Sequence, residues 1–243
     1  MTADSQLISG KVIRAIARRG FGPVLQGDRP ISRSLQSLDG ELFKRLFDIL
    51  FSLSVLILFA PVYLLLAFSI ALSSSGPIFY VQERVGKNRK RFYCLKFRTM
   101  VENADDILLE IMEKSPHLRQ EFEDNFKLKQ DPRITGIGRF LRMTSLDEFP
   151  QFWNVLKGDM SVVGPRPLVE EELPRYGRHI NKILTIRPGI TGLWQVSGRN
   201  DIPYPRRVQI DLYYANDKNL WMDMWILFKT IGVVIFPKNN GAY

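Results

Sequence analysis

Residues 49–72 read ILFSLSVLILFAPVYLLLAFSIAL, a stretch of 24 residues without a formally charged side chain. Its length is enough for one transmembrane helix, and it is too long and too far from the N-terminus for the core of a signal peptide. Pro61 lies near the midpoint, where proline removes a backbone hydrogen bond and kinks a helix. The stretch therefore predicts a membrane-bound chain, held by a kinked spanning helix or by a helix that breaks and turns back.

The charges on either side of this stretch favour a helix that turns back. Residues 1–45 carry eight Lys or Arg, and residues 73–98 carry seven. Because positive residues stay on the cytosolic side of a membrane, a spanning helix should show an unequal count. The balance predicts a re-entrant helix–break–helix over residues 39–75, with its break at Ala60 and Pro61.

The residues before the apolar stretch form a basic N-terminal tail, which we place at residues 1–38. Within it, GKVIRAIARRGFG (10–22) is mildly amphipathic and either lies on anionic lipid or is a disordered arm. Asp48 stands at the start of the apolar run, beside Lys44 and Arg45. We expect it to pair with one of these two cations at the membrane interface.

The composition of the chain limits its partners. A net charge of +9 and a pI near 9.7 favour anionic partners such as phosphate esters, an acidic membrane surface or nucleic acid. No recognisable nucleic-acid-binding module accompanies the charge, so we do not expect nucleic acid as a partner. The single cysteine, Cys94, excludes an internal disulfide and suits a cytosolic setting, and two distant histidines do not suggest a zinc site.

Residues 76–243 have the pattern of a cytosolic catalytic domain of the α+β class, rich in helices. The runs PIFYVQERV and RFYCLKFRTM flank a basic turn and predict a small β-hairpin. Helical or amphipathic patterns occupy residues 102–114, 121–129, 133–143 and 211–236. In the last of them Trp221, Trp225 and Phe228 share a face, which suits either a helix lying in the membrane interface or one packed on the core.

Residues 144–168, TSLDEFPQFWNVLKGDMSVVGPRPL, place Asp147 and Glu148 at the expected start of a helix. One explanation is structural, because Ser145 and Glu148 have the spacing of a capping box. The other is chemical: an ionised aspartate is a suitable nucleophile toward phosphorus, and a neighbouring carboxylate can hold Mg²⁺. The pair alone does not decide between them.

Several basic side chains are candidates for binding a diphosphate near this pair. Lys96 and Arg98 alternate along a strand and should face the same side. Arg142 lies just upstream of the pair, and Arg166 is held in a stiff Pro-Arg-Pro turn that suits bidentate phosphate binding. Arg199, in a glycine-punctuated loop, is a further candidate. Each arginine alone is typical of a solvated surface charge; only their combination with the carboxylates predicts a site.

These motifs resemble the monotopic phosphoglycosyl transferases, the bacterial sugar transferase family of polyprenyl-phosphate hexose-1-phosphate transferases. The matching segments are KRLFDI, GPIFYVQERVGKNRKRFYCLKFRTM, residues 144–168 and RPGITGLWQVSGRND, in order over about residues 41–236. The closing Gly-Ala-Tyr is similar to that of exopolysaccharide galactose- or glucose-phosphate transferases. The family often has Ser-Pro at the membrane break, whereas this chain has Ala60 before Pro61, which implies a shallower kink.

The resemblance implies a monotopic enzyme on the cytosolic face of the bacterial inner membrane, catalysing the first membrane step of exopolysaccharide synthesis. Asp147 would attack the β-phosphate of a UDP-sugar, release UMP and pass the hexose phosphate to undecaprenyl phosphate, while Glu148 binds Mg²⁺. Family motifs fall on Lys96, Arg142 and Arg166, and a late acidic position falls on Asp211. Galactose is favoured over glucose, and homo-oligomerisation stays open. The rival hypothesis is a non-catalytic membrane-anchored binding protein whose carboxylates only cap a helix.

Overall fold

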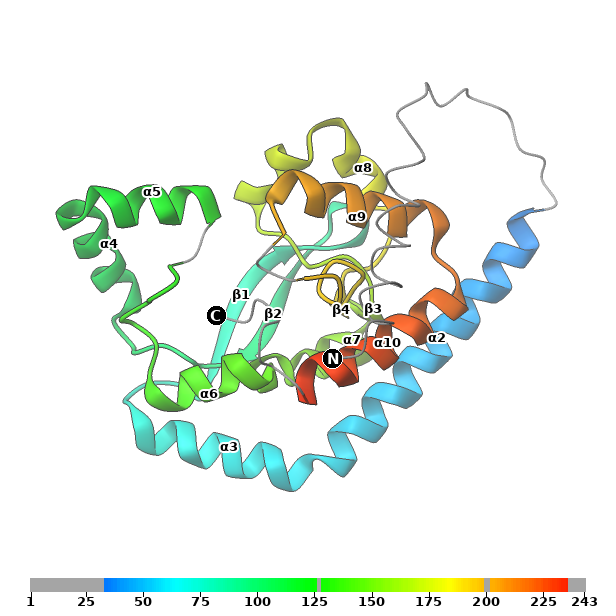
Figure 1. Ribbon diagram of the computed structural model, residues 1–243. Helices are drawn as coiled ribbons and strands as arrows, with labels where there is room; N and C mark the ends of the chain where they lie inside the picture. Colours follow the sequence, from blue (N-terminus) through cyan, green and yellow to red (C-terminus); the bar gives the residue numbers. More distant parts are fainter. Residues whose placement is uncertain (1–32, 126–127, 199–201, 236–243) are drawn as a thin grey trace, which may run out of the picture.

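The computed structural model describes residues 33–125, 128–198 and 202–235, so the predicted basic segment 10–22 and Arg199 lie outside the described residues. Helices dominate the fold and surround two small sheets (Figure 1), which confirms the helix-rich α+β class. The α-helices are α2 (Arg33–Leu58), α3 (Ala60–Ser73), α4 (Ala104–Lys114), α5 (Pro116–Asn125), α6 (Gly136–Thr144), α7 (Gln151–Lys157), α8 (Ile180–Ile183), α9 (Tyr204–Asp217) and α10 (Leu220–Ile235). The described residues also contain the 3₁₀ segments η1 (Lys87–Arg89), η2 (Leu146–Glu148) and η3 (Glu170–His179).

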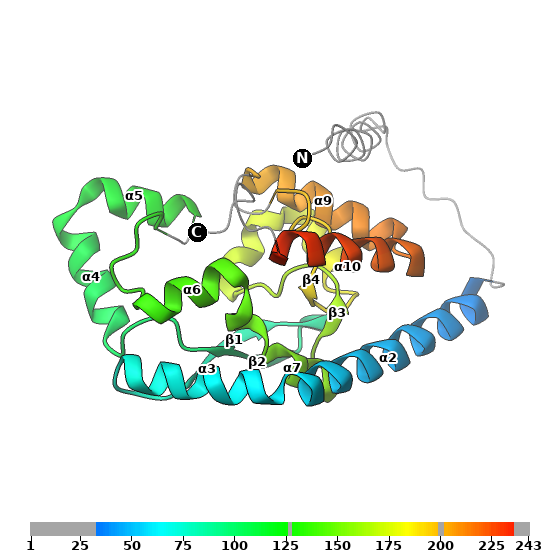
Figure 2. The ribbon, with the colours of Figure 1, turned by 60° about the horizontal axis from the view of Figure 1, so that its bottom comes forward.

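The apolar stretch forms two helices, α2 and α3, that meet at Phe59 in a wide bend (Figures 1 and 2). Pro61 occupies the first turn of α3, where its missing N–H costs nothing, so the chain restarts a helix there after the break. Among the described residues no single helix is long and apolar enough to cross a membrane; Gly40–Leu58 and Ala60–Ser73 meet length and composition criteria only as a pair bent by 62°. The helix break therefore lies at the position that Pro61 predicts, between Leu58 and Ala60.

The predicted β-hairpin is present. Strand β1 (Phe79–Val85) pairs with β2 (Arg91–Phe97) in antiparallel register, from Phe79 opposite Phe97 to Val85 opposite Arg91. The second sheet consists of β3 (Ser161–Val163) and β4 (Gly189–Thr191), which are parallel. A Cβ on Gly189 would lie 2.0 Å from the backbone nitrogen of Gly164, so this close approach requires glycine.

Two hydrophobic cores hold these elements together. The larger core gathers side chains from β3, α7, α8, α9 and the end of β1. The smaller core joins α3 to β2 and α6 through Leu66, Ile70, Phe97 and Leu141, with Leu146 packed against it. Since Phe149 packs against the larger core, the segment between α6 and α7 lies where the two cores meet.

The expected single helix over residues 211–236 is wrong, because the chain forms α9 and α10 with a turn between them. Lys218 has an extended backbone, and the side chain of Asn219 accepts a hydrogen bond from the N–H of Met222 at 3.0 Å. Asparagine favours such local capping bonds over a helix interior. The second expected helix also begins earlier than predicted, at Pro116.

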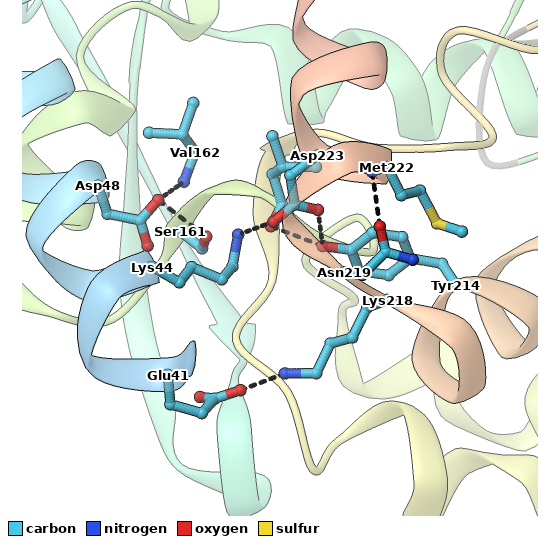
Figure 3. Close-up of polar contacts among 11 residues, drawn as sticks. Glu41, Lys44, Asp48, Ser161, Val162, Tyr214, Lys218, Asn219, Met222 and Asp223 are labelled. Atoms are coloured by element: carbon cyan, nitrogen blue, oxygen red, sulfur yellow. Dashed lines mark hydrogen bonds and ion pairs between the residues drawn. The ribbon is translucent and has the colours of Figure 1, made fainter. Parts of the chain in front are cut away.

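The expected pairing of Asp48 with Lys44 or Arg45 is also wrong. Asp48 is buried and accepts hydrogen bonds from the backbone N–H of Val162 at 3.0 Å and the Ser161 hydroxyl at 3.1 Å. Lys44 instead donates to Asp223 of α10 at 2.6 Å (Figure 3). Arg45 donates to the carbonyls of Val155 and Leu156 in the last turn of α7, at 2.6 and 2.9 Å, where a cation is favourable. These contacts attach α2 to the rest of the molecule.

We expect Asp48→Ala to destabilise the protein, because it leaves two buried donors of β3 without an acceptor. A loss of about 2–4 kcal/mol in the free energy of unfolding is typical of removing a buried charged acceptor. The exposed Asp106 provides the control, as Asp106→Ala should change stability by less than about 0.5 kcal/mol. Denaturant titration in detergent micelles measures both, and equal stability of the two variants would contradict this role for Asp48.

Candidate active site

The two adjacent carboxylates, Asp147 and Glu148, lie in η2 between α6 and α7. Helix α6 ends at Thr144 and is capped by Ser145, which has a left-handed backbone (φ 59°) and donates its N–H to the carbonyl of Arg142. The Ser145 side chain makes no capping hydrogen bond to η2. The Ser145 half of the expected capping box is therefore absent.

Glu148 forms an ion pair with Lys96 of β2. The Lys96 Nζ lies 2.6 Å from Glu148 Oε1, and both side chains are largely buried, with 20% and 25% of their surface exposed. Asn154 of α7 holds β2 in place, because it accepts from the N–H of Leu95 and donates to the carbonyl of Tyr93. The predicted association of Lys96 with the carboxylate pair is present.

Asp147 lies between Lys96 and Arg142. Burial raises the pKa of Asp147 to about 6, and the charge of Glu148 also raises it, while Lys96 and Arg142 lower it. The Arg142 Nε donates to Thr99 Oγ1 at 3.0 Å, which fixes the guanidinium near Asp147. At neutral pH the Asp147 carboxylate is therefore mostly ionised, a state that suits a nucleophile.

A small cleft opens beside Glu148. Its lining includes Lys96, Glu148 and the predicted Arg166, together with Arg84 and Gln195. Arg166 projects from the Pro-Arg-Pro turn, as expected. Sequence reasoning missed Arg84 and Gln195, since neither stands near the carboxylates or in a phosphate-binding pattern along the chain.

Arg98 does not join this group. Its Nη2 donates to the carbonyl of Ser74 at 2.7 Å and approaches that of Ile70 at 3.5 Å, so it holds the C-terminal end of α3. Strand β2 ends at Phe97, and the alternation that placed Arg98 beside Lys96 ends with it. A cation at a helix C-terminus is favourable, and this geometry favours a structural role.

Asp211 lies on α9, behind the cleft and not in its lining. It is buried, accepts a hydrogen bond from Tyr176 at 2.8 Å and lies 4.0 Å from Arg207 Nε. Burial raises the pKa of Asp211 to about 6, against the lowering effect of Arg207. Arg207 and Arg84 both face Glu172, at 3.6 and 3.7 Å, so a charged network connects Asp211 with the wall of the cleft.

The residue after the carboxylate pair, Phe149, contacts the helix break. Phe149 follows Glu148 directly, and its ring packs edge-on against Phe59, with the ring centroids 5.8 Å apart. Tyr63 donates its hydroxyl hydrogen to the carbonyl of Phe149 at 2.8 Å. Residues on both sides of Pro61 therefore hold the backbone next to the carboxylates.

The donor set near Asp147 and Glu148 fits a magnesium ion that arrives with a diphosphate. Within the described residues, no three His, Cys, Asp or Glu side chains come together as a metal-binding group. Mg²⁺, however, is commonly bound by one or two protein carboxylates plus substrate phosphates and water. Adjacent carboxylates beside a cationic cleft match that pattern.

Comparisons with known proteins agree with the sequence motifs. A family model described as "Bacterial sugar transferase" matches residues 40–237. The UDP-galactose-lipid carrier transferase of Erwinia amylovora is 48% identical over 213 residues, covering 88% of this chain and 44% of the relative. Exopolysaccharide production protein ExoY of Rhizobium meliloti (strain 1021) is 45% identical over 201 residues, covering 83% of this chain and 89% of the relative.

A more distant relative carries a different sugar in its name. The undecaprenyl-phosphate glucose phosphotransferase of Komagataeibacter xylinus is 38% identical over 241 residues, covering 90% of this chain and 40% of the relative. The chain thus spans less than half the length of the Erwinia and Komagataeibacter proteins and most of the length of ExoY.

Proposed function

The chain belongs to the bacterial sugar transferase family, and from this premise we propose that it transfers a hexose 1-phosphate from a UDP-sugar to undecaprenyl phosphate. The observation that carries the proposal is the carboxylate pair itself: Asp147 is partly buried and under the electrostatic influence of Lys96 and Arg142, and Glu148 beside it lines a cationic cleft. The product, an undecaprenyl diphosphate sugar, would begin exopolysaccharide assembly.

The proposed reaction has two displacement steps at one phosphorus atom. In the first, an oxygen of Asp147 bonds to the β-phosphorus of the UDP-sugar while the bond from that phosphorus to the bridging oxygen breaks, and UMP departs with the bridging oxygen. In the second, an oxygen of undecaprenyl phosphate attacks the same phosphorus and releases the Asp147 carboxylate. Two steps of this kind are typical of nucleophilic catalysis by carboxylates.

The neighbouring charges suit these steps. Lys96 and Arg142 offset the negative charge that an anionic nucleophile meets at a phosphate, and their fixed positions favour stabilisation of the transition state. Glu148 would hold Mg²⁺, which when bound supplies positive charge to the diphosphate. Arg166 would bind phosphate oxygens, and the buried Asp211 would orient Arg207 and Tyr176 behind the cleft.

The helix pair and α10 support a membrane position for the site. Large apolar side chains are exposed along the pair: Leu42, Phe43, Leu46, Leu50, Leu53, Ile57, Leu58, Leu64, Leu65, Phe68 and Leu72. On α10, Trp221 and Phe228 are 84% and 76% exposed, while Trp225 packs partly against the core. Exposed apolar surface of this extent is typical of a membrane contact, and a re-entrant pair would hold the site at the depth of a lipid phosphate.

A panel of UDP-sugars with a short polyprenyl phosphate, scored by UMP release, tests the proposed reaction. We expect release with UDP-galactose, and more slowly or not at all with UDP-glucose, because the galactose-named relative is more similar to this chain than the glucose-named one. Release should stop when Mg²⁺ is chelated. A non-catalytic binding protein would not release UMP from any of the UDP-sugars, and that result would contradict the proposal.

Cysteine labelling tests the re-entrant topology separately. Cysteines introduced at Ser5 and Asn88 should both react with a membrane-impermeant thiol reagent from the cytosolic side. The native Cys94 is buried and should contribute little background. Labelling of the two positions from opposite sides would show that the helix pair spans the membrane.

The pH dependence of turnover should report the ionisation of Asp147. Its pKa is raised to about 6, so its deprotonated form, which attacks, is lost as the pH falls through about 6, and kcat/KM should fall with it. Lys96 lowers this pKa, so Lys96→Met should move the acid limb to higher pH. The pKa of Asp211 is also raised to about 6, but Lys96 is not among the main charges that influence it. If the acid limb does not move in Lys96→Met, the titrating group is therefore not Asp147.

A further inference from the structure

Arg84 and Arg166 face the same cleft with unused hydrogen-bonding capacity. Arg84 is 8% exposed; its Nη1 donates to the carbonyl of Pro167 at 3.1 Å and its Nη2 to the side chain of Gln82. Its Nε is buried and has no hydrogen-bond partner. Arg166 makes no hydrogen bond or ion pair with any of the residues that the structure describes.

The charges around this pair are unbalanced. Glu172 lies 3.7 Å from Arg84 and 3.6 Å from Arg207, and Asp211 is a second carboxylate beside Arg207, at 4.0 Å. Arg166 adds a third positive charge; after burial, its proximity is the main influence that lowers the pKa of Arg84. Like charges held close in a partly buried cleft repel, and an anion between them removes the repulsion.

Gln195 gives the cleft a hydrogen-bond acceptor. Its amide nitrogen donates to the carbonyl of Ile190 at 3.2 Å, which fixes the side chain and leaves its Oε1 buried without a partner. A carbonyl oxygen repels phosphate oxygens but accepts from a hydroxyl or an imide N–H. The cleft therefore suits a ligand that combines an anionic group with a hydrogen-bond donor, as a nucleoside monophosphate does.

We propose that Arg84 and Arg166 form a clamp for the phosphate that leaves with the nucleoside, and that Gln195 accepts a hydrogen bond from the nucleoside itself. This inference rests on the proposed transfer reaction, in which UMP is the leaving group. It gives Arg84 and Gln195 a role in donor binding, whereas Lys96 and Arg142 act on the phosphorus that Asp147 attacks.

Equilibrium binding of UMP and of uridine, measured by calorimetry in detergent with EDTA present, tests the clamp. The wild-type protein should bind UMP more tightly than uridine. Arg84→Gln should weaken UMP binding by about tenfold or more, as expected for loss of a charge-assisted hydrogen bond, and leave uridine binding unchanged. Arg91→Gln is the matched control, because Arg91 is an exposed arginine of the same hairpin that pairs with Glu83 and Glu170.

A second variant tests the clamp independently, in case Arg84→Gln does not fold. Gln195→Glu keeps the size of the side chain and places a negative charge in the cleft, so UMP binding should weaken by about tenfold while uridine binding changes less. Thermal unfolding establishes that each variant is folded. If both folded variants bind UMP as the wild type does, the clamp is wrong.

The two proposals fail in different ways. Suppose that UMP binds more tightly than uridine, that Arg84→Gln abolishes this binding, and that the protein releases no UMP from any UDP-sugar. The clamp would then be supported and the transfer reaction would be wrong. Normal transfer with UMP binding indifferent to Arg84 and Gln195 would keep the reaction and overturn the clamp.

Discussion

Asp147→Asn is expected to reduce UMP release from a UDP-sugar by roughly 10³-fold or more, because an amide cannot form the bond to phosphorus that the proposed reaction requires. The substitution preserves the size of the side chain and removes a partly buried charge whose pKa is already raised to about 6, so folding should be unharmed. Initial rates of UMP release measure the effect, and thermal unfolding checks the fold.

The matched control for this variant is Asp106→Asn, which makes the same chemical change on the exposed surface of α4. It should release UMP at the wild-type rate. If the asparagine variant at position 147 turned over normally in a folded protein, Asp147 would not be the nucleophile.

Glu148→Gln should lower turnover by about 10²-fold for a different reason, because removal of a group that holds a metal ion or aligns a cation costs transition-state stabilisation. The charge of Glu148 raises the pKa of Asp147, so its removal lowers that pKa and keeps the nucleophile ionised. The variant should thus lose activity while its acid limb moves to lower pH, and it should need more Mg²⁺. Rate–pH profiles at several Mg²⁺ concentrations measure these three effects.

Glu171→Gln provides the comparison for Glu148→Gln, since Glu171 is exposed on η3. Its rate, pH profile and Mg²⁺ requirement should match those of the wild type. Activity of Glu148→Gln that is restored by a simple change of pH would show that Glu148 acts only through the ionisation of Asp147.

Much of the fold could be predicted because its signals are local. Pro61 within an apolar run predicts the break between α2 and α3, and the two aromatic runs around a basic turn predict the β1–β2 hairpin. In these places neighbouring residues decide the geometry. Lys96 was expected near the carboxylates only as a phosphate-binding residue, and its ion pair with Glu148, 52 positions along the chain, was not expected.

The contacts that sequence reasoning missed depend on distant segments. Asp48 bonds to β3, more than 100 positions along the chain, because folding brings the buried donors of Ser161 and Val162 next to its carboxylate. Arg98 lies just after the end of β2, and its side chain donates to the carbonyl of Ser74 at the end of α3. The network of Arg84, Glu172 and Arg207 joins β1, η3 and α9, and no spacing along the chain indicates it.

Mass spectrometry of the enzyme incubated with UDP-sugar alone, without a lipid acceptor, tests the central claim most directly. With no acceptor to complete the second step, the account predicts a hexose phosphate attached to the peptide that contains Asp147, formed together with one equivalent of UMP and missing from Asp147→Asn. An enzyme that transfers sugar phosphate to the lipid yet shows no adduct on that peptide under trapping conditions would contradict it.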